Sequence, residues 1–293
     1  MDLERFLAGN RKLVESHLRT LFSNLPGFSH TLKDAMEYSL FSDGKRIRPS
    51  LAIAACEAME GRADEVLPFA AALEMIHTYS LIHDDLPCMD DDDLRRGKPT
   101  CHKVFGEAVA LLAGDALLTE AFRVMADPQL CRVPPSVAQR VIFEVARAAG
   151  AAGMVAGQTM DVLSEGKAGT KRMVNFIHRN KTSALIRASI LSGALVGRAD
   201  RLQLRAFTTF GESIGLAFQI RDDLLDVQGT EAEVGKKLNK DAAKQTYVRH
   251  YGVEASKARI ESLVDKAVAS LAFLGKRANM LIQMANFIGH RSF

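Results

Sequence analysis

Helix-type spacing of apolar residues runs through nearly the whole 293-residue chain. Alanine, leucine and methionine are abundant, whereas alternating runs of β-branched residues, the usual pattern of a half-buried strand, are hard to find. No linker, low-complexity tract or fixed-period repeat divides the sequence. We therefore predict an all-α fold, a single domain over residues 1–293 whose helices pack around a shared core.

The expected helices are separated by turn residues, among them Asn24-Leu25-Pro26-Gly27 and Ser42-Asp43-Gly44. They cover residues 3–21, 31–40, 50–60, 64–83, 106–126, 137–164, 171–196, 199–227, 240–251 and 253–288. Many of them are apolar around much of their circumference. Such helices belong at the centre of a bundle or at a subunit interface.

Composition excludes several classes of protein. A hydrophobic content of 47% and a charged content of 25% are typical of a soluble globular chain. The net charge of +3 argues against a dedicated nucleic-acid binder. The four cysteines show no C-x-x-C pair, so we expect reduced thiols. We see no signal-peptide pattern and no apolar run of membrane-spanning length, and so expect a cytoplasmic protein without stable membrane insertion.

An acidic stretch follows the apolar helix expected at 64–83, with six carboxylates in the ten positions 84–93. Clustered carboxylates raise one another's pKa unless a cation neutralises them, and their hard oxygen atoms suit Mg²⁺. On a straight helix Asp84 and Asp90 lie roughly 120° apart. Pro87 breaks the helix between them, and an irregular turn can return Asp90 to the side of Asp84. The alternative is a solvated acidic loop.

A second acidic cluster places Asp222 and Asp226 at i and i+4 on one helix face, while Asp223 points roughly 100° away. Alone, such a pair is more typical of a solvated surface, but the apolar residues 214–218 before it disfavour that interpretation. Two aspartate-rich helix ends together predict metal ions held between facing acidic walls.

Acidic walls that hold metals usually serve a phosphorylated substrate, whose remaining oxygens need cationic side chains. His77 lies two helical turns before Asp84 and shares its face, although a buried core histidine is the simpler explanation. The sequence has neither a phosphate-binding P-loop nor a dinucleotide glycine fingerprint. The candidate basic residues are Lys45, Arg48, Arg95, Arg96, Lys181, Lys236 and Lys244.

These motifs together resemble those of the trans-prenyl diphosphate synthases. Asp84-Asp85-x4-Asp90 followed by Arg95-Arg96-Gly97, and Asp222-Asp223-x-x-Asp226, are similar to the two aspartate-rich motifs of that family. The two extra residues around Pro87 resemble bacterial farnesyl and plant-type geranylgeranyl diphosphate synthases. Further similar segments are Gly44-Lys45-Arg46-Ile47-Arg48-Pro49, Gly157-Gln158-x-x-Asp161, Lys181-Thr182 and Phe218-Gln219.

The resemblance implies an isoprenoid-synthase-type bundle around a central active-site cavity. It assigns three Mg²⁺ ions to Asp84, Asp85, Asp90, Asp222 and Asp226. It assigns the allylic diphosphate to Arg95, Lys181 and Lys236, with Thr182, Gln219 and Lys244 close by. It assigns isopentenyl diphosphate to Lys45, Arg48, His77 and Arg96, beside Gly44. The residues expected to be catalytic are Asp84, Asp85, Asp90, Lys181 and Asp222.

The implied activity is a short-chain trans-prenyltransferase that joins dimethylallyl or geranyl diphosphate to isopentenyl diphosphate, giving farnesyl diphosphate and pyrophosphate. Tyr79 matches the aromatic that limits the product tail in bacterial farnesyl synthases, although helical phase alone would place Ser80 beneath Asp84. Ordinary core packing explains Tyr79 equally well. A C20 geranylgeranyl product is the alternative, followed by a non-catalytic subunit of a heteromeric synthase. The family also implies a homodimer.

Two departures from the family pattern affect the predicted site. Asp43 stands where glycine is more usual, and residues 240–247 form a run about two residues shorter than the family's. The second departure leaves the register of Lys244 open.

Overall fold

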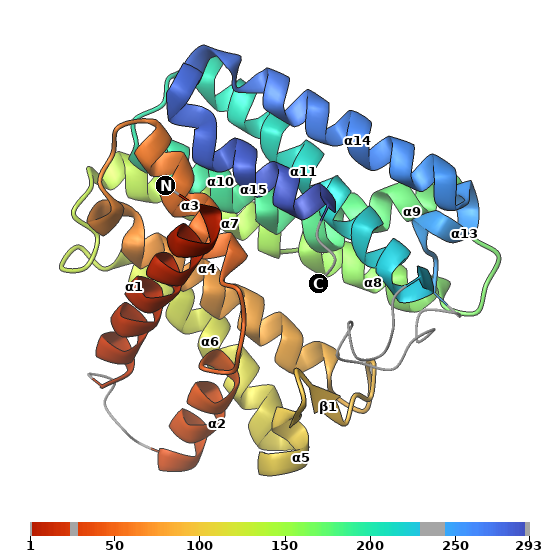
Figure 1. Cartoon of the computed structure of the whole chain (residues 1–293). Helices are drawn as coiled ribbons and strands as arrows, with labels where there is room; N and C mark the ends of the chain where they lie inside the picture. Colours follow the sequence, from red (N-terminus) through yellow and green to blue (C-terminus); the bar gives the residue numbers. More distant parts are fainter. Residues whose placement is uncertain (1, 24–28, 229–243, 291–293) are drawn as a thin grey trace.

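The computed structural model describes residues 2–23, 29–228 and 244–290. The predicted all-α fold is confirmed (Figure 1). Over the described ranges the only strands are β1 (Leu94–Arg95) and β2 (Lys98–Pro99), which form a short antiparallel hairpin. None of the described helices is long and apolar enough to cross a bilayer.

The helices follow one another with short connections. The first half of the chain forms α1 (Leu3–Ser23), α2 (His30–Leu40), α3 (Ile47–Ala58), α4 (Ala63–Asp84), α5 (Cys101–Phe105), α6 (Glu107–Ala126), α7 (Pro135–Ala149) and α8 (Met154–Ser164). The second half forms α9 (Lys171–Ile177), the π-helical segment η1 (His178–Ser183), α10 (Ala184–Val196), α11 (Arg201–Gln228), α13 (Tyr247–Tyr251), α14 (Val253–Ser270), the 3₁₀ segment η3 (Ala272–Ala278) and α15 (Asn279–His290).

Three of the predicted long helices are wrong in their continuity. The helix expected at 137–164 is two helices, because the backbone turns between Gly150 and Gly153. The helix expected at 171–196 passes through the π-helical segment η1, and that at 253–288 is broken where Gly275 takes φ 54°. Glycine allows such backbone changes without disturbing the apolar pattern around it. Of the helix expected at 240–251, only α13 lies within the described residues.

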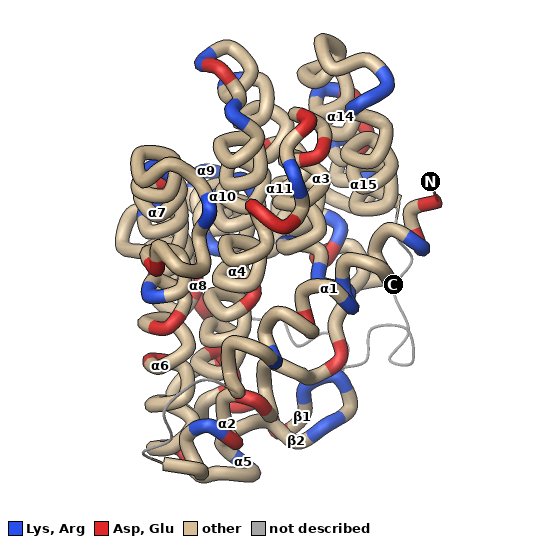
Figure 2. The backbone as a smooth tube through the Cα atoms, turned by 90° about the vertical axis from the view of Figure 1, so that its left-hand side faces the viewer, with Lys and Arg blue, Asp and Glu red and all other residues tan. Residues whose placement is uncertain are grey.

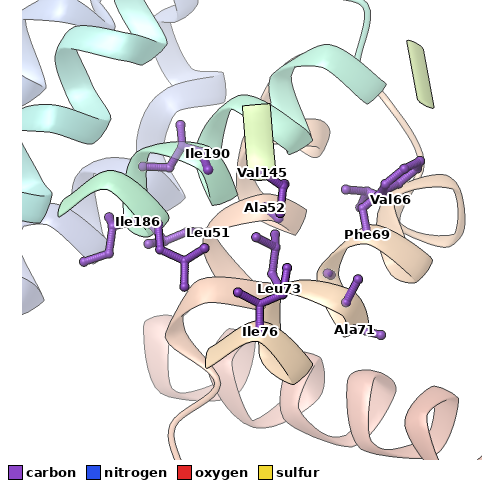
Figure 3. Close-up of a cluster of buried hydrophobic side chains, with 14 of the residues drawn as sticks. Leu51, Ala52, Val66, Phe69, Ala71, Leu73, Ile76, Val145, Ile186 and Ile190 are labelled. Atoms are coloured by element: carbon purple, nitrogen blue, oxygen red, sulfur yellow. The ribbon is translucent and has the colours of Figure 1, made fainter. Parts of the chain in front are cut away.

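The core lies where α3, α4 and α10 pack against one another, with α7 beside them (Figure 3). Leu51 of α3, Leu73 of α4 and Ile190 of α10 are fully buried. Gly193 sets the spacing, because a Cβ atom there would lie 1.9 Å from the carbonyl oxygen of Ala52. Of the two positions expected for the most apolar helices, a central position or a subunit interface, α3, α4 and α10 occupy the central one.

This packing places the acidic ends of α4 and α11 on the same side of the molecule, near the hairpin and α13 (Figure 1). Basic and acidic residues are interspersed along the coloured part of the tube in Figure 2, and neither sign occupies a whole side of that view. The charged residues relevant to a site are therefore the local group at the neighbouring ends of α4 and α11.

Candidate active site

A cavity of about 1110 Å³ lies between the ends of α4 and α11 and is lined also by α1, η1 and the loop before α3. Four predicted residues that the structure describes, Asp85, Thr182, Tyr79 and Ser80, are not part of its lining. Lys236 lies outside the described residues. The cavity brings together the other predicted residues: Asp84, Asp90, Asp222, Asp226, Gly44, Lys45, Arg48, His77, Arg95, Arg96, Lys181, Gln219 and Lys244.

The first acidic wall is shaped by a tight turn after α4. The helix ends at Asp84, and the backbone N–H of Asp90 then donates to the carbonyl oxygen of Asp84 at 2.9 Å. The N–H of Asp92 donates likewise to the carbonyl oxygen of Asp85 at 3.3 Å. The predicted break near Pro87 and the return of Asp90 to the side of Asp84 are confirmed.

Asp84 and Asp90, two of the carboxylates of this wall that line the cavity, differ in acidity. Burial raises the pKa of Asp84 to about 6, an effect that the charge of Lys181 opposes and that of Asp90 reinforces. Burial alone would also raise the pKa of Asp90, but the Lys244 ammonium, 3.0 Å from Oδ1, lowers it below the ordinary value. Asp84 is thus a half-buried acid whose ionised form needs more positive charge than the protein supplies.

Asp85 makes a different contact from the one expected. Both oxygens of its buried carboxylate accept from Arg95: Oδ1 accepts from Nε at 2.7 Å and from Nη2 at 2.5 Å, and Oδ2 accepts from Nε at 2.9 Å. This bidentate pair holds Arg95 of β1 at the cavity. Thr100 fixes the base of the hairpin, because its Oγ1 donates to the carbonyl oxygen of Asp92 at 2.7 Å. That Asp85 also binds metal stays a prediction.

The second group of basic residues comes from three neighbouring segments: Lys45 from the loop before α3, Arg48 from the first turn of α3 and Arg96 from the turn of the hairpin. Arg96 donates from Nη1 to the carbonyl oxygen of Asp43, and a Cβ on Gly44 would lie 2.7 Å from the same nitrogen. A larger residue at position 44 would therefore displace the Arg96 guanidinium from its present place. Asp43, the unusual residue here, accepts a hydrogen bond at 2.8 Å from Arg11 of α1. His77 faces the same cavity, and burial, then the charges of Arg48 and Arg96, lowers its pKa well below the ordinary value.

Arg46 organises this loop, although the sequence did not single it out. Its buried guanidinium donates to Glu74 at 2.8 Å and to Glu15 at 3.0 Å, and its own backbone takes φ 48°. A buried charge must be paired, and here acids from two helices supply the pairing. The sequence does contain one indication of this buried ion pair: Glu74 is an acidic residue within the apolar helix expected at 64–83.

Lys181 lies in the π-helical segment η1, and its Nζ donates to Oδ2 of Asp161 on α8 at 2.7 Å. Two glycines allow this segment to sit deep between neighbouring helices. A Cβ at Gly157 would lie 2.2 Å from the backbone nitrogen of Lys181, and one at Gly215 would lie 2.8 Å from the Cα of Ser183. Single π-helical turns are frequent at functional sites because they redirect side chains.

All three aspartates of the second acidic wall line the cavity, Asp223 as well as the i, i+4 pair Asp222 and Asp226. Asp223 is also engaged by donors from the protein. Asp223 is buried and accepts hydrogen bonds from Gln219 at 3.1 Å and from the backbone N–H of Tyr247 at 2.5 Å. Its neighbour His178, 3.2 Å away, also lines the cavity and was missed from the sequence.

The donor set fits Mg²⁺. Asp84, Asp90, Asp222 and Asp226 present only carboxylate oxygens, the ligands that a hard cation prefers. Among the described residues, no three acidic, histidine or cysteine side chains converge on one point. Substrate oxygens and water would therefore complete each coordination shell, as is usual for Mg²⁺ beside a phosphorylated ligand.

Comparisons with known proteins agree with this geometry. The chain is 47% identical over 269 residues to a farnesyl diphosphate synthase of Geobacillus stearothermophilus, covering 91% of this chain and 90% of the relative. It is 45% identical over 295 residues to a geranylgeranyl diphosphate synthase of Cyanophora paradoxa, covering 99% and 97%. A solved structure of an FPP/GFPP synthase from Zymomonas mobilis superposes with a TM-score of 0.87 at 34% identity, covering 99% of this chain and 100% of that one.

Residues 29–272, most of the chain, match the polyprenyl synthetase family. Membership of that family implies Mg²⁺-dependent catalysis. The protein therefore belongs to the polyprenyl synthetase family and is a short-chain trans-prenyltransferase of isoprenoid biosynthesis.

Proposed function

We propose that this enzyme makes farnesyl diphosphate from isopentenyl diphosphate and dimethylallyl or geranyl diphosphate. The observation that carries the proposal is one cavity with two sets of cationic side chains. Arg95, Lys181 and Lys244 act electrostatically on Asp84 between the acidic walls. Arg48 and Arg96 act most strongly on His77, which Arg95 also affects, and Lys45 is another residue of the lining. A reaction between two diphosphates needs such a pair of sites.

Asp84, Asp90, Asp222 and Asp226 would hold Mg²⁺, and we propose three ions, with Asp85 joining if Arg95 moves to the substrate. When bound, Mg²⁺ would neutralise the allylic diphosphate and stabilise the charge of the departing pyrophosphate. Lys181, Lys244 and Arg95, now bonded to Asp161, Asp90 and Asp85, would donate to the same oxygens. Their hydrogen bonds strengthen as the allylic C–O bond breaks and charge accumulates on oxygen.

Lys45, Arg48 and Arg96 would hold isopentenyl diphosphate beside the allylic carbon. His77 contributes a neutral polar surface there, because burial and the neighbouring arginines lower its pKa. The double bond of isopentenyl diphosphate attacks the allylic cation, a new C–C bond forms, and loss of a proton gives the trans product. Released pyrophosphate is the base placed to take that proton.

Incubation with isopentenyl diphosphate, dimethylallyl diphosphate and Mg²⁺ is expected to give a C15 diphosphate as the main product. Chromatography of the dephosphorylated products identifies the chain length. A C20 main product would support the alternative, geranylgeranyl diphosphate, which the mixture of relatives keeps open. Absence of elongation would contradict the proposal and support a non-catalytic subunit, which the two intact aspartate motifs disfavour.

Tyr79 supports the C15 product. It is buried on α4, its ring packs edge-on against His83 at 5.7 Å, and burial with the charge of Asp84 raises its pKa to about 12. The ring therefore lies close to the first acidic wall. Ser80 instead donates to the carbonyl oxygen of His77 at 2.8 Å, within its own helix.

Tyr79→Ala is therefore expected to shift the product from C15 toward C20, because removing the ring opens space below Asp84. Product chromatography measures the shift. Ser80→Phe is the companion variant, since it shortens the product only if Ser80 faces the growing tail. An unchanged distribution in Tyr79→Ala would leave Tyr79 as a core-packing residue.

We also propose a homodimer, formed through the outer face of α5 and α6. Val104, Leu111 and Leu112 are 47%, 46% and 56% exposed there, an apolar group typical of an interface. Leu112→Glu is expected to halve the mass measured by sedimentation. Leu202→Glu is the control, because Leu202 is 72% exposed at the start of α11, away from this face. A monomeric unaltered protein would contradict the proposal.

A further inference from the structure

A buried pair at the edge of the cavity has no part in the chemistry described so far. His178, the first residue of η1, and Asp223 of α11 have side chains only 3% and 4% exposed, with Nε2 3.2 Å from Oδ2. An ionised carboxylate only accepts hydrogen bonds, so Nε2 carries the hydrogen and donates it. Asp223 is thus committed to the protein rather than to a ligand.

The same carboxylate holds the segment that carries Lys244. The backbone N–H of Tyr247 donates to Oδ2 of Asp223 at 2.5 Å. The ring of His178 is stacked with that of Tyr247, with centroids 6.1 Å apart and planes at 24°. Three residues before Tyr247, Lys244 reaches across the cavity to Asp90. Asp223 therefore joins α11, η1 and the segment that precedes α13.

The other carboxylate oxygen of Asp223 is linked through Gln219 to Thr182, the residue that follows Lys181. Oδ1 accepts from Nε2 of Gln219 at 3.1 Å, and Oε1 of Gln219 accepts from Oγ1 of Thr182 at 2.6 Å. His178 lies before Lys181 in the π-helical segment, and Thr182 follows it directly. Both ends of the short stretch around Lys181 are thus tied to one carboxylate.

We propose that His178 is a positioning residue for the allylic diphosphate, and that its bond to Asp223 fixes Lys181 and Lys244 together. This inference rests on the proposed assignment of both lysines to that diphosphate. A lysine side chain has four rotatable bonds, so its backbone must be held firmly if the ammonium group is to meet a developing charge. The residues proposed for isopentenyl diphosphate lie on α4, the hairpin, the loop before α3 and the first turn of α3, outside this network.

The test compares two replacements of His178 by steady-state kinetics in each substrate. His178→Leu keeps the bulk of the side chain but loses the hydrogen-bond donor. We expect it to lower kcat/KM for dimethylallyl diphosphate by about 10²-fold, the loss that a misplacement of catalytic groups by about 1 Å can cause. The KM for isopentenyl diphosphate is expected to stay near that of the unaltered enzyme. His178→Gln, whose amide nitrogen can occupy the place of Nε2, is expected to recover most of the loss.

Tyr251→Phe is the matched control. It removes the hydrogen bond that Tyr251 accepts from Asn175 at 3.0 Å but keeps the ring stacked on Tyr247, so unaltered kinetics are expected. Equal losses for both substrates, or no recovery in His178→Gln, would overturn the positioning role. If His178→Leu does not fold, His178→Asn replaces it, since its amide is too short to reach Asp223.

The inference and the proposed function fail in different ways. An unaltered enzyme that does not elongate dimethylallyl diphosphate contradicts the proposed function. If the unaltered enzyme is active and the His178→Leu variant has the same kinetics, only the proposed role of His178 is contradicted.

Discussion

Replacement of Asp84 by asparagine is expected to lower turnover by about 10²–10³-fold, the loss typical when one electrostatic contact to the transition state is removed. Asparagine keeps the shape of the side chain but removes the charge. Burial already raises the pKa of Asp84 to about 6, so its anion strongly favours a neighbouring cation. The variant should also need more Mg²⁺ for half-maximal rate, which a titration of initial rates measures.

Asp91→Asn is the control within the same acidic stretch. Asp91 is exposed, does not line the cavity and has a backbone φ of 47°, a conformation that asparagine tolerates. Its turnover and Mg²⁺ requirement are expected to match those of the unaltered enzyme. If Asp84→Asn behaved in the same way, Asp84 would not be a metal ligand.

Replacement of Lys181 by methionine is expected to lower turnover by about 10²-fold, because an ammonium group that stabilises the leaving pyrophosphate is lost. The change has a second consequence. Lys181 and Asp161 form a pair whose side chains are 23% and 8% exposed, so the variant leaves a nearly buried carboxylate unpaired. Loss of one partner from a buried pair costs about 3 kcal/mol of stability.

A double variant separates the two effects of this change. Lys181→Met combined with Asp161→Asn removes the unpaired charge and should restore much of the melting temperature, measured by circular dichroism. Turnover should stay low, because the ammonium group is still absent. If the double variant recovered both stability and turnover, Lys181 would serve the fold alone. Lys167→Met, at an exposed lysine after α8, is the control for loss of a positive charge.

The fold could be predicted to the level of its helices because apolar periodicity is a local property. The long helix expected at 64–83 is observed as Ala63–Asp84, and the break after it follows from Pro87. The breaks between Gly150 and Gly153 and at Gly275 were not predicted. There the apolar spacing of the sequence continues, while the backbone of the structure leaves the helix at glycines.

The residues that make up the site could be predicted from the sequence to about the same extent as the helices. Residue types and spacing were enough to pair Asp84 with Asp90 and Asp222 with Asp226, and all four line one cavity. They were not enough to show that Asp85 bonds to Arg95. A contact of this kind depends on where the hairpin folds back, which no periodicity records.

The sequence by itself determined an all-helical chain with two acidic helix ends and enough basic residues for phosphorylated substrates. Only the tertiary structure decided which donors of the protein reach which aspartate of the shared cavity. Asp90 meets Lys244 across 154 residues, and Asp223 receives the backbone N–H of Tyr247 24 residues away. A carboxylate becomes a ligand or an anchor according to the donors that reach it, and those donors come from distant segments that only packing brings close.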